Sequence, residues 1–194
     1  MIIGITGGIG AGKSTVAKIL RTMGYPVYDS DARARTLQDE NINMKLKIQE
    51  LFGADIYKES GLNRPALAKI VFNKPELLAQ LSNIVHPVVQ SDFEAWVKLN
   101  SQAKVVFIES AILFESHFDK LTDKTILVTA FEEIRIARVA KRDNISSEQV
   151  RERIRRQTSD EDKKKWVNVV IYTDDQEQTL SKKVESALLV LLSN

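Results

Sequence analysis

Cysteine is absent from the 194-residue sequence, and histidine occurs only twice, as His86 and His117. Disulfide bonds, thiolate zinc sites and cysteine nucleophiles are therefore excluded, and a histidine-rich metal site is not expected. A chain without cysteine fits a reducing compartment, so the sequence predicts a cytoplasmic protein.

Long apolar segments are missing as well. The longest run without a polar residue, residues 187–192, is far shorter than the ~18 residues that indicate a membrane span. The apolar start of the chain has no basic flank of the kind that opens a signal peptide. We therefore expect a soluble protein that is neither secreted nor bound to a membrane.

Neither sign of charge is in large excess, because the formal net charge is only +2. So small an excess argues against a nucleic-acid partner. The charge is nevertheless uneven, since residues 135–165 hold eleven Lys or Arg against six Asp or Glu. This local excess favours a small anionic ligand, and we expect a monomer or a weak homo-oligomer.

Short apolar runs alternate with helical patterns, which predicts an α/β fold with a parallel sheet. Strands are predicted at residues 1–6, 25–28, 104–109, 124–129 and 167–172. Helices are predicted from near Lys13 to 23, through most of 31–98, and at 132–142, 146–157 and 180–191. Pro87 is expected to break or kink the helix that contains it. Ligands of such a sheet bind beyond the carboxyl ends of the strands, where residues 7–14, residues 29–31 and Glu109 fall.

A complete phosphate-binding loop follows the first predicted strand. Residues 7–14 read GGIGAGKS and match G-x-x-x-x-G-K-[ST] between a strand and a helix. We expect Lys13 to reach the β- and γ-phosphates of ATP, Ser14 to bind Mg²⁺ and Thr15 to line the α-phosphate. The loop residues expected to contact ATP are Gly8, Ile9, Gly10, Ala11, Gly12, Lys13, Ser14 and Thr15. The alternative is a glycine-rich turn that binds no nucleotide.

Among proteins with this loop, small-molecule kinases fit best. A regulatory GTPase would carry a D-x-x-G segment, and no Asp in this chain is followed by Gly three residues later. The N-K-x-D segment of such proteins has only a near match at residues 73–76, and a motor ATPase would need a longer chain. A kinase needs a carboxylate near the acceptor and mobile basic groups, which residues 29–31, Glu109 and 135–165 offer.

Several further motifs make the sequence resemble the dephospho-CoA kinase family. They are D-S-D-A-R-A-R at 29–35, I-V-H-P at 84–87, I-L-F-E at 112–115, R-V-A-K-R-D at 138–143 and R-I-R-R-Q at 153–157. The resemblance implies a P-loop NTPase three-layer α/β/α core with a helical substrate-binding insertion and a helical lid. The core would comprise residues 1–30, 99–137 and 166–194, the CoA-binding insertion 31–98, and the lid 138–165. The implied reaction is phosphorylation of the ribose 3′-hydroxyl of dephospho-CoA by ATP.

The resemblance also implies roles for individual residues. Asp31 would orient the attacking hydroxyl and accept its proton, or else only cap a helix. Glu109 would hold Mg²⁺ through water with Ser14, or only satisfy a neighbouring loop. The catalytic group would comprise Asp31, Lys13, Arg138 and Arg142. The substrate-binding group would comprise Asp31, Arg35, His86, Pro87 and Leu113, although His86 equally suits a buried, hydrogen-bonded position.

Two segments depart from the family pattern. Ser110-Ala111 replaces a Val-Pro pair, which changes the rigidity of a loop near the acceptor. Thr173 stands where the family has Asn, so recognition of adenine by an Asn side chain is in doubt here.

Other prominent side chains suit structural roles. Phe93 and Trp96 are expected in the core. Arg135, Arg151 and residues 163–165 are expected on solvated helix faces.

Two other functions stay open at this stage. The first is a kinase for a nucleoside monophosphate or a sugar acid, which would share the core but not the acceptor pocket. The second is a binding protein that uses ATP as a switch. The Asp31 carboxylate and the basic segment argue against the switch, because both suit phosphoryl transfer.

Overall fold

The computed structural model describes residues 1–72, 74–174 and 177–193, without the side chains of 177 and 178. The chain divides into two compact units. One, the sheet unit, combines Met1–Asp29 with Asn100–Asn194, and the other, the helical unit, is Ser30–Leu99. Residues 73, 175, 176 and 194 lie outside the described residues, so predictions that fall on them, such as the 73–76 segment, are tested only in part.

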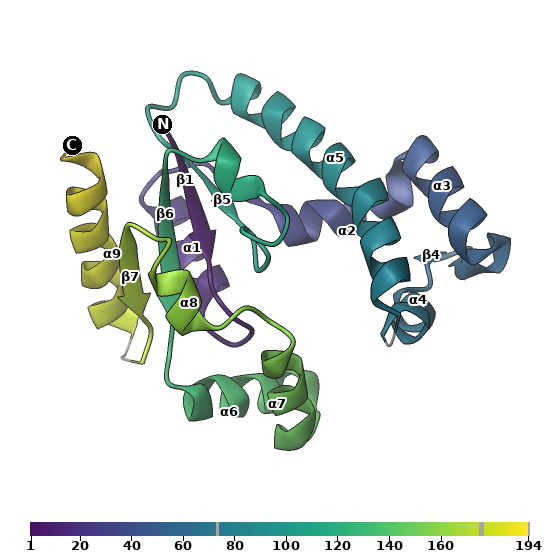
Figure 1. The fold of residues 1–194 in the computed structure, drawn as a ribbon. Coiled ribbons are helices and arrows are strands. Elements are labelled where there is room, and N and C mark those ends of the chain that lie inside the picture. The colour runs from purple at the N-terminus through teal and green to yellow at the C-terminus, as the bar shows by residue number, and fades with distance from the viewer. Residues whose placement is uncertain (73, 175–176, 194) are drawn as a thin grey trace. The chain divides into compact units, whose positions relative to one another are not determined.

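The sheet unit is built on five parallel strands in the order β2-β5-β1-β6-β7 (Figure 1). The strands are β1 (Ile2–Thr6), β2 (Val27–Asp29), β5 (Val106–Glu109), β6 (Lys124–Thr129) and β7 (Val169–Tyr172). The predicted α/β fold with a parallel sheet is therefore confirmed. Three strands start two residues later than predicted: β2 at Val27, β5 at Val106 and β7 at Val169.

The two faces of the sheet are covered differently. Alternate residues of β1, Ile3 and Ile5, belong to a buried cluster with side chains of α1 (Lys13–Thr22) and α9 (Glu177–Leu192). Gly4 faces the other side, where Leu113 of the segment after β5 lies against it. That segment ends in the short helix η2 (Phe118–Leu121). Because strand side chains alternate, one face thus packs on long helices and the other on a loop.

The residues between β6 and β7 form three helices: α6 (Glu132–Asp143), α7 (Ser147–Arg155) and α8 (Asp160–Lys164). Ser146 caps α7 in a reciprocal capping box with Gln149, which fixes the start of that helix. The pattern of residues 146–157 did not predict the separate helix α8. The fully buried Val150 packs on α6 in a small apolar cluster of its own.

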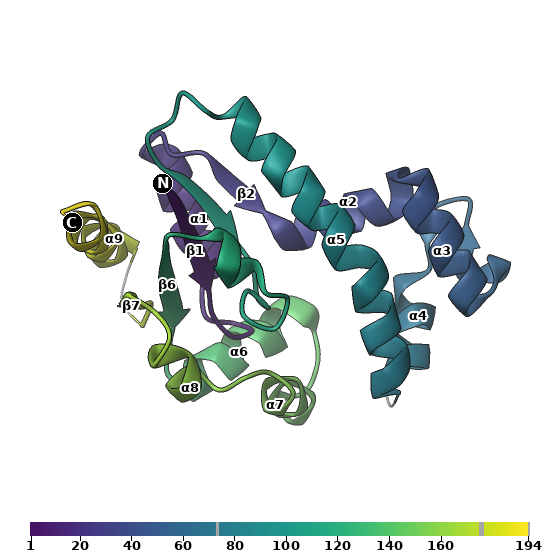
Figure 2. The ribbon, with the colours of Figure 1, turned by 45° about the horizontal axis from the view of Figure 1, so that its top comes forward.

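The helical unit contains α2 (Ser30–Glu40), α3 (Ile42–Phe52), η1 (Ala54–Ile56), α4 (Arg64–Val71) and α5 (Pro75–Leu99) (Figure 2). It also contains a short hairpin, β3 (Tyr57–Lys58) with β4 (Gly61–Leu62), which the all-helical reading of this region missed. Of the two effects expected at Pro87, the break is wrong, because α5 continues through it, and the kink stays a prediction. Val85, Val89 and Phe93 are buried on both sides of Pro87, and this packing outweighs the lost backbone hydrogen bond. Phe93 is buried as predicted and stacks on Trp96.

None of the helices in the described ranges has the length and apolar character needed to cross a membrane.

Candidate active site

The phosphate loop has the local structure that its sequence predicts. The loop leaves β1 after Thr6, and Gly12 caps α1 with a φ of 89°, a conformation that favours glycine. Lys13 is the first residue of α1, and its Nζ donates a hydrogen bond to the carbonyl of Gly7 at 2.9 Å. The lysine side chain therefore folds back over the loop, with the amino end of α1 beside it, an arrangement that suits phosphate binding.

Two carboxylates lie on neighbouring strands at the same edge of the sheet. Asp29 at the end of β2 is in register with Glu109 at the end of β5, and Glu109 is in register with Ile5 of β1. Glu109 is largely buried. The sequence predicted that residues 7–14, residues 29–31 and Glu109 would converge at one edge. The part of this prediction that lies within the sheet unit, Asp29, Glu109 and the phosphate loop, is confirmed.

The donors available for a metal ion at this edge are oxygen atoms. The Ser14 hydroxyl lies in the first turn of α1 and the Glu109 carboxylate ends β5. Within the described residues, no group of three or more His, Cys, Asp or Glu side chains could hold a metal ion. A site with few protein oxygens suits Mg²⁺, which keeps several waters and shares its coordination with phosphates.

Arg138 is fixed beside the phosphate loop by Thr173, the residue that follows β7. Its Nη1 donates to Thr173 Oγ1 at 2.9 Å and its Nη2 to the Thr173 carbonyl. The Thr173 hydroxyl in turn donates to the carbonyl of Ala11 at 2.8 Å. Thr173 therefore links the end of β7 to both the loop and the arginine, a role that the sequence did not predict.

Arg142 lies one turn beyond Arg138 on α6 and is mostly exposed. Its Nε pairs with Asp143 at 2.7 Å, and Arg153 of α7 pairs with the same carboxylate at 2.9 Å. The hydrogen bond from Arg142 is the main cause that lowers the pKa of Asp143, and it raises the pKa of Arg142 in return. This cluster joins α6 to α7 by charge-assisted hydrogen bonds.

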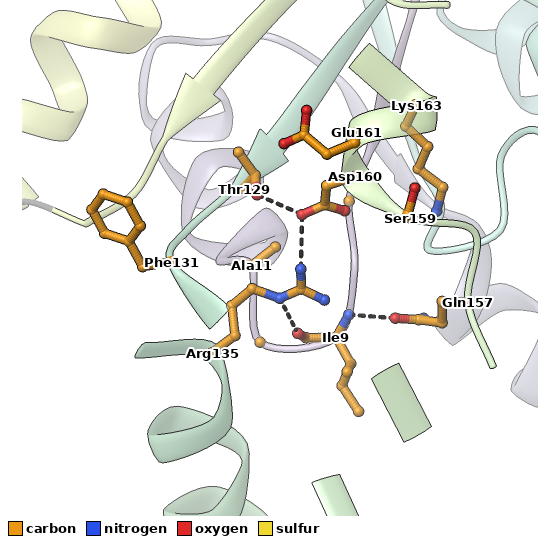
Figure 3. Close-up of polar contacts among 12 residues, drawn as sticks. Ile9, Ala11, Thr129, Phe131, Arg135, Gln157, Ser159, Asp160, Glu161 and Lys163 are labelled. Atoms are coloured by element: carbon orange, nitrogen blue, oxygen red, sulfur yellow. Dashed lines mark hydrogen bonds and ion pairs between the residues drawn. The ribbon is translucent and has the colours of Figure 1, made fainter. Parts of the chain in front are cut away.

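The expectation of solvated helix faces for Arg135 and Lys163 is wrong. Arg135 is 7% exposed and Lys163 is fully buried. Lys163 Nζ of α8 pairs with Glu115 Oε1 at 3.3 Å, so the buried ammonium has a counter-charge on a side chain that is itself 33% exposed. Arg135 pairs with Asp160 and contacts the phosphate loop (Figure 3). Arg151, by contrast, forms surface ion pairs with Glu132 and Glu133.

The predicted acceptor residues lie mostly in the helical unit. Asp31 and Arg35 are exposed and four residues apart on α2, so they share one face of that helix. His86 is half-buried on α5, and Pro87 is exposed and lines a pocket of about 530 Å³ within this unit. Leu113 belongs to the sheet unit and is fully buried against Gly4. Leu113 therefore serves the core in this structure, and its contact with substrate stays a prediction.

The sheet unit has a pocket of its own, of about 520 Å³, between the end of β6 and the segment from α7 to α8. Both charged and aromatic side chains line it, including Phe131, Arg135, Arg155, Asp160 and Lys164. None of the residues predicted to bind ATP or the acceptor contributes to its lining. It nevertheless adjoins the phosphate loop, because Arg135 and Gln157, which line it, both hydrogen-bond to Ile9.

Comparison with known proteins assigns the family. The family model described as dephospho-CoA kinase matches residues 1–179, most of the chain. The chain belongs to the dephospho-CoA kinase family. A dephospho-CoA kinase from Porphyromonas gingivalis is 45% identical over 152 residues, which are 78% of this chain and 75% of the relative.

Two solved structures agree with this assignment. The protein TT1252 from Thermus thermophilus is 37% identical with a TM-score of 0.82, covering 100% of this chain and 96% of its own. A dephospho-CoA kinase from Campylobacter jejuni is 25% identical with a TM-score of 0.71. This match covers 98% of this chain and 96% of the Campylobacter chain. The resemblance inferred from ordered motifs is thereby confirmed, and the dephospho-CoA kinase reading is supported over another small-molecule kinase.

Proposed function

We propose that the protein transfers the γ-phosphate of ATP to the ribose 3′-hydroxyl of dephospho-CoA, which gives CoA and ADP. The observation that carries the proposal is the match of residues 1–179 to the dephospho-CoA kinase family around a complete phosphate loop. The reaction would complete the biosynthesis of coenzyme A. The enzyme would act as a soluble protein in the cytoplasm.

The phosphate loop would bind ATP through its backbone N–H groups, from Gly8 to Thr15, and through Lys13. The Lys13 ammonium, now bonded to the carbonyl of Gly7, would reach the β- and γ-phosphates with little movement. Fixed donors of this kind stabilise the charge that develops on phosphate oxygens during transfer.

Ser14 and Glu109 would hold Mg²⁺, Ser14 directly and Glu109 through water. When bound, the ion would neutralise part of the negative charge on the phosphate oxygens. The oxygen donors at the edge of the sheet suit such a site, as described above.

Asp31 would orient the 3′-hydroxyl and accept its proton as the new bond to phosphorus forms. Arg35, His86, Pro87 and Leu113 would contribute to binding of dephospho-CoA. The helical region 31–98 would form the CoA-binding insertion. The exposure of Asp31 and Arg35 on one face of α2 supports a role in binding a ligand.

Arg138 and Arg142 would balance the charge of the transferred phosphate as part of a lid formed by residues 138–165. Arg138 is already held near the loop, with its Nη1 3.4 Å from the carbonyl of Gly10. Arg142 would have to exchange Asp143 for phosphate. That exchange costs little, because exposed ion pairs contribute only about 0–1 kcal/mol.

The decisive experiment measures ADP release from ATP by the purified protein with and without dephospho-CoA. We expect release that depends on dephospho-CoA and falls ~10²-fold or more in both Lys13→Ala and Asp31→Asn. Turnover with AMP or a sugar acid, but none with dephospho-CoA, would contradict the substrate and leave the kinase assignment standing.

A further inference from the structure

The side chain of Arg135 lies directly against the phosphate loop. The glycines at positions 8 and 10 leave the space it needs, because a Cβ at Gly8 would lie 2.0 Å from Arg135 Nη2. A Cβ at Gly10 would lie 2.6 Å from the carbonyl oxygen of Arg135. The two glycines therefore allow the first turns of α6 to approach the loop closely.

Ile9, the residue between these glycines, is held at both of its backbone polar groups (Figure 3). Arg135 Nε donates to the Ile9 carbonyl at 3.0 Å. The Ile9 N–H donates to Gln157 Oε1 at 2.8 Å. Both partners come from the segment between β6 and β7, so this segment fixes the orientation of two consecutive peptide groups in the phosphate loop.

Asp160 fixes Arg135 in turn. Its Oδ2 accepts a hydrogen bond from Arg135 Nη1 at 2.8 Å and another from the hydroxyl of Thr129 at the end of β6. The side chains of Arg135 and Asp160 are only 8% and 12% exposed. A buried ion pair is weak evidence for stability, because two charges must leave water to form it, so a role in fixing geometry is a better explanation.

We propose that Arg135 is a positioning residue for phosphoryl transfer, which acts by holding Ile9 and is itself held by Asp160. This inference rests on the proposed kinase function and deepens it. A shift of the loop donors by a fraction of an ångström weakens their contact with the phosphates, and such misplacement slows the reaction strongly. Arg135 contributes through the position of Ile9 rather than by touching the substrate.

The test compares Arg135→Met with the double variant Arg135→Met/Asp160→Asn. The single variant leaves a buried carboxylate without its counter-charge, so its thermal midpoint falls. In the double variant, Asn keeps an oxygen acceptor for Thr129 and removes the charge, so the midpoint recovers. Neither variant restores the bond to Ile9, and we expect kcat to stay ~10-fold to 10²-fold low in both, with KM for dephospho-CoA within about twofold of wild type.

Arg21→Met is the matched control, because Arg21 is exposed on α1, outside the phosphate loop and the proposed lid, and donates a surface hydrogen bond to the carbonyl of Val27. Its kcat should equal that of the wild type. If the double variant recovers both the thermal midpoint and kcat, Arg135 is only structural and the proposal is wrong.

A second readout separates this inference from the proposed function. Calorimetric titration with Mg-ADP needs no acceptor, and we expect about 10-fold weaker binding in both Arg135 variants. If wild-type protein releases no ADP in response to dephospho-CoA, the proposed function fails. In that case the affinity for Mg-ADP alone tests whether Arg135 positions the phosphate loop. Wild-type affinity in the double variant would overturn this positioning role.

Discussion

At the scale of single residues, Thr173 holds Arg138 beside the phosphate loop. Its hydroxyl donates to the carbonyl of Ala11 and accepts from Arg138. Thr173→Val keeps the shape and removes the hydroxyl, which leaves the Ala11 carbonyl without this donor. We expect a loss of about 1–3 kcal/mol in the free energy of unfolding and weaker binding of ATP, measured by urea unfolding and by nucleotide titration.

Thr173→Ser is the control for this prediction, because it retains the hydroxyl. The serine variant should keep the affinity for ATP close to that of the wild type. Equal stability and affinity in the valine variant would show that the hydroxyl has no part in holding the loop.

Glu115 and the buried Lys163 give the stability a dependence on pH. Burial by itself raises the pKa of Glu115. Hydrogen bonds from its own backbone N–H and from Thr158, together with the charge of Lys163, outweigh this effect, so the pKa of Glu115 lies below the usual value of 4.5. A lowered carboxyl pKa stabilises the fold above the unfolded-state pKa, and this stabilisation is lost as the pH falls through the folded-state pKa.

Glu115→Gln should therefore destabilise the protein most near neutral pH. Removing Glu115 leaves the fully buried Lys163 without this counter-charge, but the Glu115 side chain is 33% exposed, so the cost should fall below the ~3 kcal/mol of a fully buried pair. The difference from wild type should begin to shrink as the pH falls below the unfolded-state value of 4.5, and it should vanish once the pH is below the lowered folded-state pKa, where Glu115 is neutral in both states. Chemical unfolding at several pH values measures this, and a difference independent of pH would contradict it. Glu148→Gln, on the exposed surface of α7, is the control.

At the scale of elements, α5 contains a proline that costs it stability. Pro87 has no N–H to donate to the carbonyl of Asn83, one turn earlier in the helix. Pro87→Ala should raise the free energy of unfolding by about 1–2 kcal/mol, less than the full penalty of proline because alanine also gains freedom in the unfolded chain. Urea unfolding measures this change, with Gln80→Ala at an exposed position of the same helix as the control. Unchanged or lower stability of Pro87→Ala would show that contacts of the proline ring outweigh the missing backbone hydrogen bond.

The sequence predicted those elements whose signals are local. The phosphate loop, the start of α1 and the start of α7 near Ser146 each depend on residues within a few positions of one another. The helix through Pro87 and the short hairpin β3–β4 were missed for a different reason. The helix continues through Pro87 because Val85 and Phe93 pack in the interior on both sides of it. The hairpin was missed because strands of two residues are too short to show an alternating pattern.

The buried charges were missed because their partners are distant in sequence. Arg135 bonds to Ile9, 126 residues away, and Lys163 pairs with Glu115. Both belong to a segment with many exposed charges, so composition alone favours a solvated surface. An acidic residue at the start of a short helix, such as Asp160, is also a common helix feature and gave no sign of a buried pair.

At the scale of the whole molecule, the proposed nucleotide site and the proposed acceptor carboxylate belong to different units. The phosphate loop lies in the sheet unit, and Asp31 is in the first turn of α2 in the helical unit. Binding of ATP and transfer of its phosphate should therefore respond to different substitutions.

Ligand-induced stabilisation tests this separation. Mg-ADP at about 100 times its dissociation constant should raise the free energy of unfolding of the wild type by about 2.7 kcal/mol. Asp31→Asn should keep that increase although its turnover falls ~10²-fold, whereas Lys13→Ala should lose most of it at the same concentration. Removal of Mg²⁺ with a chelator should reduce the wild-type increase, because the phosphates then lose a counter-charge. If Asp31→Asn also lost the stabilisation, the carboxylate would be needed for nucleotide binding itself, and its assignment to the acceptor hydroxyl would be wrong.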